Sequence, residues 1–552
     1  MSENPSPAEG RHCGGSRLSA RWTTALATAL FPTALSAQGT DGLLASPPHA
    51  GVVEPLKPPD VAPLNGFLDI DGHERPFTPA SEQAFNAPRG APRYWLAAAE
   101  DLVFLGFGTA FYWLRTDINQ KDWDRPSLMD RLTLAAVRFD NNDSLTNHVV
   151  HPFSGAAYYA TARVNNIDPL PASLYAFGGS LVWESALEWR ELISINDMVF
   201  TSVGGLAMGE FFFQMGEYAT TRRHPNWLGT VGEWTFGMPR AVHRAIFDDQ
   251  PPHSELPPDA LGLDSSRSHR FYVAPQFMTI ADRMTHERMY GLVAEAELAR
   301  LPGFGRPGRF ATTFSQGNFT EASVETNTNE NDGLDLDLWF LATFWGRYAQ
   351  TYDLPAPGEE PAGHATMIGL STALRYADHH FLDRRDQVAV CHLLGPNFSF
   401  FGQTGSLRTR LDANAHVDFA AIRSLAFEDW RRDHDPTGVK SVLVDQNYQF
   451  HMGGSTRVRA SAQWGPALAG VRGAFGLYES LEGADRFEEK VSHDLHGSER
   501  LWEWGAWVGG SVPPAHLEIR LGLDAFGRDS HIADVRVRRW DLRTRLSVGA
   551  IF

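Results

Sequence analysis

Cysteine is almost absent from this chain of 552 residues, which contains only Cys13 and Cys391. Cys13 falls in an N-terminal segment with the pattern of an export signal, so the exported chain would retain Cys391 alone. A single cysteine excludes an internal disulfide. We interpret Cys391 as a small apolar packing residue rather than as a nucleophile.

Basic residues are also scarce relative to acidic ones. The chain has 48 Lys and Arg against 66 Asp and Glu, which gives a net charge of -18. Nucleic-acid binding needs a surplus of positive charge, so this balance argues against nucleic acid as a partner. It equally disfavours binding to an anionic membrane surface. The sequence also lacks any uninterrupted run of the roughly 18 apolar residues that a transmembrane helix needs.

The N-terminus has the three-part pattern of a secretory signal peptide. A basic region with three arginines precedes a short apolar core at residues 25–35, and small residues surround a cleavage point after Ala37. This pattern predicts a signal peptide over residues 1–37. The stretch 38–93 is rich in Pro, Gly and Ala without a sustained period, which predicts a flexible leader.

The remaining sequence divides into two parts with different periods. Apolar residues recur with helical spacing over residues 94–247, which predicts a helical domain. A Pro-, Asp- and Ser-rich linker is predicted at residues 248–268. Over residues 269–552 the period changes to two, as expected for β-strands.

The alternation in the C-terminal part is long and regular. Every second residue is apolar or threonine over residues 407–419, with polar or charged residues between, and residues 540–552 follow the same pattern up to Gly549. Strands of this length suit a tilted membrane crossing, and their number is even, as in single-chain bacterial barrels. The predicted fold class is α+β: a small helical domain followed by an antiparallel transmembrane β-barrel of about 12 strands.

The lumen of this barrel is predicted to be largely filled rather than an open pore. Trp339 and Trp345 are predicted to face inward beside Asp335, Asp337 and Arg347, where bulky and charged side chains would occupy the space. The charged residues of the 408–418 strand are likewise predicted to face the lumen and to pair with one another or with an inserted domain, rather than to act on a substrate.

One stretch of the helical region carries a recognisable motif. It reads FDNNDSLTNHVVHPFSGAAYYATARVNN from Phe139 and continues through GGSLVWESALEW and SINDMVFTSVGGLAMGE. Over residues 131–218 the chain resembles domain of unknown function 3943, a Gram-negative envelope family with this N-H-x-x-H-P-x-x-G-x-x-Y-Y pattern. The family has no assigned activity, so the resemblance implies an envelope protein and supplies no mechanism.

Polar residues set into these apolar helices are the candidate site residues, because buried polar groups must be paired. His148 and His151 are spaced i, i+3 and are predicted to share a helix face, while Glu184 and Glu188 are predicted to share a stripe of the next helix. Asp197 begins the third helix. The catalytic candidates are His148, His151, Glu184, Glu188 and Asp197. The metal-ligand candidates are His148, His151, Glu184 and Asp197.

Each candidate also has a structural interpretation. Histidines on a helix face are often hydrogen-bonded core or surface residues, and Ser194 with Asp197 fits an S-x-x-[DE] capping box. Ser154 could pair with His151 as in a hydrolase, but no GxSxG elbow accompanies it. The sequence therefore leaves open whether the protein is an enzyme. It calls for no cofactor beyond a divalent metal ion at the candidate ligands.

Two functions from different classes remain. The first is an outer-membrane β-barrel protein with a structural or transport role in the cell envelope, its helical domain either plugging the barrel or standing in the periplasm. The second is a lipid- or envelope-modifying enzyme with a His/Glu/Asp site in the helical domain. A polytopic inner-membrane protein is disfavoured, because Glu210 interrupts its most apolar helix.

The expected location is the cell outer membrane, reached through the N-terminal signal peptide. The expected partners are outer-membrane lipid and the barrel-assembly machinery, with no nucleic acid. The sequence leaves the oligomeric state open.

Overall fold

The computed structural model describes residues 65–86, 90–114, 125–221, 227–249, 267–281, 286–329, 334–355, 359–381, 384–483, 494–512 and 515–552. The predicted signal peptide, most of the predicted leader and almost all of the predicted 248–268 linker lie outside these residues.

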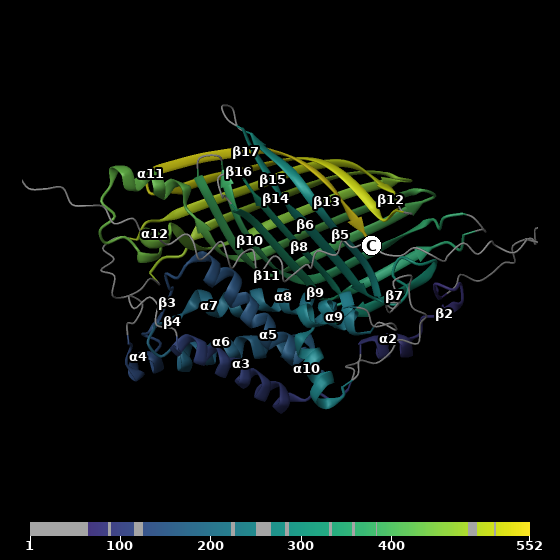
Figure 1. Ribbon diagram of the computed structural model, residues 1–552, viewed down its shortest axis with the longest axis horizontal. Coiled ribbons are helices and arrows are strands. Elements are labelled where there is room, and N and C mark those ends of the chain that lie inside the picture. Colours follow the sequence, from purple (N-terminus) through teal and green to yellow (C-terminus); the bar gives the residue numbers. More distant parts are fainter. Residues whose placement is uncertain are drawn as a thin grey trace, which may run out of the picture. The chain divides into compact units, whose positions relative to one another are not determined.

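Twelve strands form a closed antiparallel ring, because β9 pairs with β10 and the last strand pairs with the first (Figure 1). The predicted helical region followed by a twelve-stranded antiparallel barrel is thus confirmed. The strands of the ring are β5 (Arg267–Ala281), β6 (His286–Arg300), β8 (Phe319–Thr328), β9 (Leu334–Tyr352), β10 (Gly363–Phe381), β11 (Arg384–Thr404), β12 (Leu407–Arg423), β13 (Tyr448–Trp464), β14 (Ala467–Ser480), β15 (Gly497–Val512), β16 (Leu517–Ile532) and β17 (Val535–Ile551).

Successive side chains alternate between the lumen and the outer surface, as the period of two predicts. Asp541 and Arg543 of β17 are buried in the lumen, whereas Leu546 on the same strand is 44% exposed outside. Trp339 faces the lumen, but the prediction for Trp345 was wrong, since Trp345 is 57% exposed on the outer face. The cause is a β-bulge, in which Phe344 is an extra residue that reverses the alternation beyond it.

The ring closes at a seam between β17 and β5. Pairing runs from Leu542–Ala281 to Ser547–Gln276, stops, and resumes at Ala550–Val273 in the same register. Pro275 lies in this gap, and it has no backbone N–H to donate to a neighbouring strand. The seam is therefore one of the places in the ring where the ladder is interrupted.

A second interruption lies between β6 and β9. β7 (Gly308–Phe314) and β8 both pair with the same side of β9, one after the other, so that they form two pieces of one strand position. Residues 315–318 between them leave the sheet; we call them the docking loop. The N-terminal strands β1 (Gly66–Leu68) and β2 (Glu74–Pro76) and helix α2 (Pro79–Asn86) pack against β7, so residues 65–86 of the predicted flexible leader are structured.

One mouth of the barrel is covered by the segment between β12 and β13. It contains α11 (Leu425–Asp433) and α12 (Ser441–Gln446). Phe427 of α11 packs in a buried cluster with Ile532 and Val537, which face the lumen on β16 and β17. Because β16 and β17 lie far around the ring from β12, α11 crosses the opening (Figure 1).

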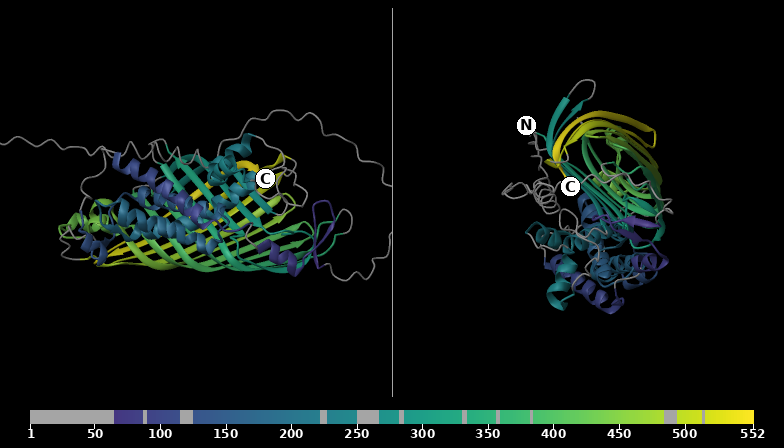
Figure 2. Two further views of the ribbon diagram at one scale, coloured as in Figure 1. Left: turned by 90° about the horizontal axis from the view of Figure 1, so that it is seen from below. Right: turned by 90° about the vertical axis from the view of Figure 1, so that its right-hand side faces the viewer.

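The helices form a layer along one side of the barrel (Figures 1 and 2). Phe211 and Phe212 pack on Phe340, and Phe200 packs on Phe419. Phe340 and Phe419 point away from the lumen, so the layer lies on the outer wall and does not plug the barrel. Its elements are α3 (Tyr94–Leu114), α4 (Leu128–Leu132), η2 (Thr146–Val150), α5 (His151–Val164), α6 (Pro169–Val182), η3 (Trp183–Leu187), α7 (Ile195–Val199), η4 (Phe200–Gly204), α8 (Gly205–Thr220), α9 (Trp227–Phe236) and α10 (Met238–Phe247), where η denotes a π-helical turn.

Close packing inside the layer depends on glycine. A Cβ atom added to Gly155 of α5 would lie 1.7 Å from the carbonyl oxygen of Thr201, which no side chain can tolerate.

Among the described helices, none combines the length and apolarity needed to cross a bilayer.

Candidate functional site

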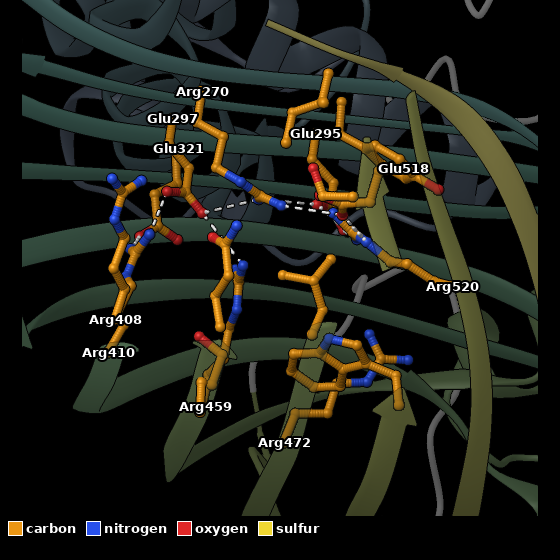
Figure 3. A pocket seen from close by; sticks show the side chains of 18 of the residues that line it. Arg270, Glu295, Glu297, Glu321, Arg408, Arg410, Arg459, Arg472, Glu518 and Arg520 are labelled. Carbon is orange, nitrogen blue, oxygen red and sulfur yellow. Dashed lines mark hydrogen bonds and ion pairs between the residues drawn. The ribbon is translucent and has the colours of Figure 1, made fainter. Parts of the chain in front are cut away.

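A large cavity in the described residues lies in the barrel lumen, at the end that carries the chain terminus. It has a volume of about 1050 Å³ and is lined by charged side chains from strands all around the ring (Figure 3). The labelled side chains in Figure 3 point from opposite walls toward one another. The charged residues of its lining are Arg270, Glu295, Glu297, Glu321, Glu325, Glu360, Arg408, Arg410, Arg457, Arg459, Arg472, Glu518, Arg520, Asp524 and Arg545.

Ion pairs cross the lumen between strands on opposite walls. Arg410 on β12 pairs with Glu297 on β6, and Arg375 on β10 pairs with Glu503 on β15. Beyond the cavity, Arg528 on β16 bridges to Asp386 on β11. These pairs hold the two walls together. Within the 408–418 strand, Arg410 also pairs with Asp412, as predicted.

An apolar cluster lies in the lumen between the cavity and α11. Val390 of β11 and Ile422 of β12 are buried against Tyr478 of β14, two strands farther around the ring. The tyrosine hydroxyl donates to Asp418, 3.1 Å away, so its polar end is satisfied. The cluster narrows the lumen on this side, and α11 covers the mouth beyond it.

One arginine of the cavity differs from the others. Among the described residues, Arg457 forms no ion pair with a carboxylate. Its guanidinium instead lies 4.2 Å from the ring centre of Trp339, a cation–π contact that fixes its position. By contrast, Arg472 nearby is paired with Asp524 at 2.8 Å. Arg457 is therefore a positioned positive charge that faces the cavity without a partner.

A second candidate site lies inside the helical layer. His151, Glu184 and Asp197 place their ligand atoms within 4.8 Å of one another. The Nε2 atom of His151 is 3.7 Å from Oδ2 of Asp197. Glu184 and Asp197 are buried, while the His151 side chain is 17% exposed. The structure thus brings together three of the predicted candidates from three separate elements.

Helix ends and π-helical turns position these side chains. Ser194 caps α7, and its Oγ accepts the N–H of Asp197 at 3.2 Å, which is one half of the predicted capping box. The backbone N–H of Ser194 donates to Oε2 of Glu184 at 3.0 Å. Glu184 lies in the π-turn η3, where helix α6 has already ended. Both carboxylates are therefore oriented by the same short stretch of chain.

Burial dominates the electrostatics of this group. It raises the pKa of Asp197 to about 7 and raises the pKa of Glu184 well above its usual range, with the neighbouring Glu188 adding to the shift on Glu184. Burial also lowers the pKa of His151. The guanidinium of Arg131 donates to backbone carbonyl oxygens such as that of Glu184, so it acts on the carboxylates through its charge and not through hydrogen bonds.

Two predicted candidates lie apart from this group. His148 points toward the barrel, where it contacts the rings of Phe200 and Tyr448 and bonds to Ser144 Oγ at 3.0 Å. The predicted shared face with His151 fails because the π-turn η2 separates them, and a π-turn winds more slowly than an α-helix. Glu188 accepts the indole N–H of Trp183 at 3.1 Å instead.

The proposed serine–histidine pair is not formed. The Ser154 hydroxyl donates to the carbonyl oxygen of Val150 at 3.1 Å, which is the ordinary bond of a serine within a helix.

Sequence reasoning assigned no role to two residues that complete the cluster. Asn196 donates to Asp197 at 3.0 Å and to Asp140 at 2.7 Å, so it links the two carboxylates. Asp140 also accepts from Asn147 at 2.7 Å. The signal was present as the D-N-N-D run just before the histidine motif, but its partner Asn196 is distant in sequence.

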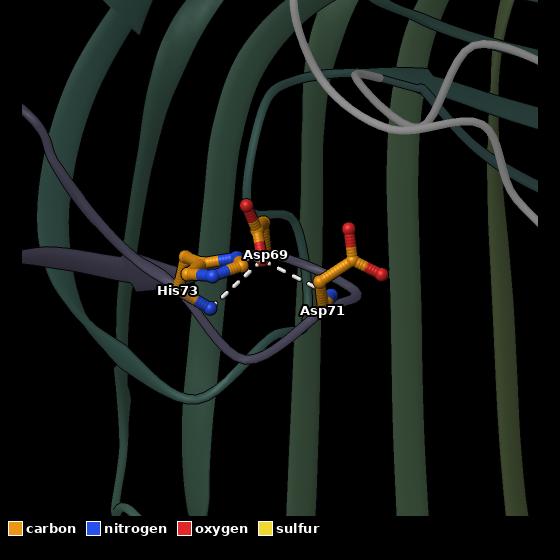
Figure 4. A group of neighbouring side chains, drawn as sticks. All are labelled: Asp69, Asp71 and His73. Carbon is orange, nitrogen blue, oxygen red and sulfur yellow. Dashed lines mark hydrogen bonds and ion pairs between the residues drawn. The ribbon is translucent and has the colours of Figure 1, made fainter.

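A further acidic group near the N-terminus is already satisfied (Figure 4). Asp69 accepts the backbone N–H groups of Asp71 and His73 at 3.0 and 2.9 Å, and its other oxygen accepts from Arg75. Asp71 and His73 are exposed. This is a turn stabilised by an aspartate rather than a ligand site.

One protein-family model matches the segment that contains the histidine motif. Residues 136–237 match the model of a domain of unknown function, DUF3943. The resemblance predicted over residues 131–218 is confirmed, and the DUF3943 match extends it through α9. His151, Glu184 and Asp197 all lie within the DUF3943 segment. A search of curated proteins finds no match to this chain.

Solved structures similar to the chain are outer-membrane proteins. They include opdK from Pseudomonas aeruginosa, at 10% identity over 52% of this chain and 98% of that chain with a TM-score of 0.15. The channel DcaP of Acinetobacter baumannii has 12% identity over 52% of this chain and 97% of that chain, with a TM-score of 0.19. At TM-scores this low, the likeness to these structures adds no evidence for the fold beyond the strand pairing described above.

Proposed function

We propose that this protein is an outer-membrane β-barrel whose lumen is a blind, charged vestibule that holds a small anionic solute, rather than an open diffusion pore. The observation that carries the proposal is Arg457, a fixed and unpaired guanidinium inside a cavity of about 1050 Å³. Guanidinium groups bind carboxylates and phosphates through paired hydrogen bonds, so an anion is the fitting occupant.

The outer surface supports a place in a bilayer. Apolar side chains cover the outward face of β13 to β17, each 40% or more exposed, and a soluble protein rarely exposes so large a patch. They are Val458, Val471, Phe475, Leu477, Trp504, Val508, Ile519, Leu521, Leu523, Trp540, Leu546 and Val548.

The connections between strands support an orientation. Two-residue turns occur at both ends, joining β11 to β12 and β13 to β14 at the end with the chain terminus and β16 to β17 at the other end. The longer α11–α12 segment, between Arg423 and Tyr448, lies at that other end. Outer-membrane barrels have short periplasmic turns and longer extracellular loops. The vestibule would then open toward the periplasm, with α11 on the outer side.

A membrane location has a direct test. We expect the full-length protein in the outer-membrane fraction, and we expect unheated samples to migrate faster on a denaturing gel than boiled ones, because a closed barrel resists detergent. Recovery from the soluble periplasmic fraction, without heat-dependent migration, would refute the location.

Anion binding can be tested at the residue that carries the proposal. We expect titration calorimetry with inorganic phosphate to show binding, and the Arg457→Gln variant to bind about tenfold to a hundredfold more weakly, since a charge-assisted hydrogen bond contributes about 1.5–3 kcal/mol. Arg538→Gln is the matched control, because Arg538 is exposed and lies outside the lumen. Equal affinities of Arg457→Gln and the wild type would contradict the proposal.

A further inference from the structure

The three side chains that meet in the helical layer have the composition of a metal site. We infer that His151, Glu184 and Asp197 bind one divalent transition-metal ion of the zinc type. This goes beyond the proposed lumen function and does not depend on it. Imidazole nitrogen and carboxylate oxygen are ligands that zinc accepts, and three protein ligands leave the fourth position open.

The spacing of the donor atoms is close to what a metal ion needs. Zinc bonds to nitrogen and oxygen of about 2.0–2.1 Å place tetrahedral ligand atoms roughly 3.4 Å apart. The His151 Nε2 and Asp197 Oδ2 atoms are 3.7 Å apart, and Glu184 contributes an oxygen within 4.8 Å of both. Small side-chain rotations bring these atoms to bonding distance.

A second, independent observation points to a ligand. The Oε1 atom of Glu184 is buried and has no hydrogen-bond partner among the described residues, although the side chain is only 1% exposed. A buried carboxylate oxygen without a partner is costly. The other oxygen of Glu184 is held by the Ser194 N–H, so the free oxygen is the one available to a cation.

Neighbouring groups hold each ligand in place, as outer partners do in metal sites. The Nδ1 atom of His151 lies 3.4 Å from the Thr201 hydroxyl, which leaves Nε2 directed at Asp197. Asn196 holds one oxygen of Asp197 and leaves the other toward His151. The His151 side chain is partly exposed, so a metal ion can reach the site from solvent on that side.

A cation would also suit the group of carboxylates. Asp140, Glu184 and Asp197 lie within one buried network, and the hydrogen bonds of Arg131 go to backbone oxygens rather than to these carboxylates. A bound divalent ion would favour the ionised form of these groups, as an adjacent positive charge does.

The test measures metal binding by the purified full-length protein. We expect one Zn²⁺ per chain after dialysis against Zn²⁺ and removal of the excess, and visible absorption of a low-coordinate site when Co²⁺ replaces it. We expect no displacement by Mg²⁺, which prefers six oxygen ligands. Glu184→Gln and Asp197→Asn should each weaken Zn²⁺ binding by at least about a hundredfold, more than the loss of an outer partner does.

His148→Gln is the matched control, because His148 is close in sequence but bonds to Ser144 on the barrel side. This variant should bind Zn²⁺ as the wild type does. The absence of stoichiometric Zn²⁺ in the wild-type protein would overturn the inference even if a variant failed to fold. Unchanged Zn²⁺ affinity in Glu184→Gln would overturn it as well, whatever the outcome of the phosphate titration.

Discussion

Reconstituted in a planar bilayer, the wild-type protein should conduct almost no ions. Three obstacles lie in series along the lumen: the helix α11 over one mouth, the apolar cluster around Tyr478, and ion pairs such as Arg375–Glu503 that join opposite walls. Ions cannot pass a dry, close-packed section, because desolvating them is too costly. Steady single-channel steps from the wild type would show that the lumen is open.

The same measurement separates the obstacles. Replacing residues 425–446 with a short Gly-Ser linker should leave the barrel silent, since the apolar cluster remains beneath α11. Adding Tyr478→Ala and Arg375→Ala should produce conductance, because the largest side chain of the apolar cluster and one ion pair across the lumen are then removed. Arg538→Ala in the same background is the control, since it removes a charge outside the lumen. Conductance after the linker replacement alone would mean that α11 is the sole barrier.

Removing the Glu210 carboxylate should detach the helical layer from the barrel. Glu210 of α8 is fully buried and accepts from Arg163 at 2.9 Å and from Tyr159 at 2.6 Å. Arg163 in turn donates to the backbone oxygen of Gln316 in the docking loop at 3.2 Å. Glu210→Ala would leave the buried guanidinium unpaired, which typically costs about 3–5 kcal/mol.

The effect should appear as a lower temperature for the gel-migration shift and as protease cleavage within residues 136–237. Glu482→Ala is a suitable control, because Glu482 is a half-exposed partner of His496. Gly317→Ala should act in the same direction as Glu210→Ala. Gly317 has a φ of +64°, and an added Cβ would lie 2.3 Å from a Glu210 oxygen. A wild-type transition temperature in both variants would show that this contact does not secure the layer.

The barrel could be predicted from the sequence because its signal is local and repeated. Apolar and polar residues alternate along each strand, and the structure places them on opposite faces as expected. The alternation could not reveal the bulge at Phe344, which turns Trp345 outward without any change in composition. It also gave no sign of Arg457, whose lack of a carboxylate partner depends on residues from other strands.

The candidate site in the helical layer could be predicted from the sequence only in part. Helical spacing was a sound guide to which polar residues matter, but it assumed regular α-helices. The structure has π-helical turns at η2 and η3. For this reason His148 points away from His151, and Glu188 does not lie on the same helix face as Glu184. The convergence of Glu184 with Asp197 arises instead from the cap at Ser194, which periodicity alone does not predict.

The proline in the closing seam bears on the order in which the molecule is assembled. The helical layer contacts β8 to β13 and, through Tyr218 and Gln214 of α8, also β5 on one side of the seam. Phe271 of β5 packs on Tyr218 and exchanges backbone hydrogen bonds with Phe552, so the ring closes directly beside the helices. Docking of α8 would therefore hold the first strand in place for the last one, and lateral opening would begin at the weaker ladder beside Pro275.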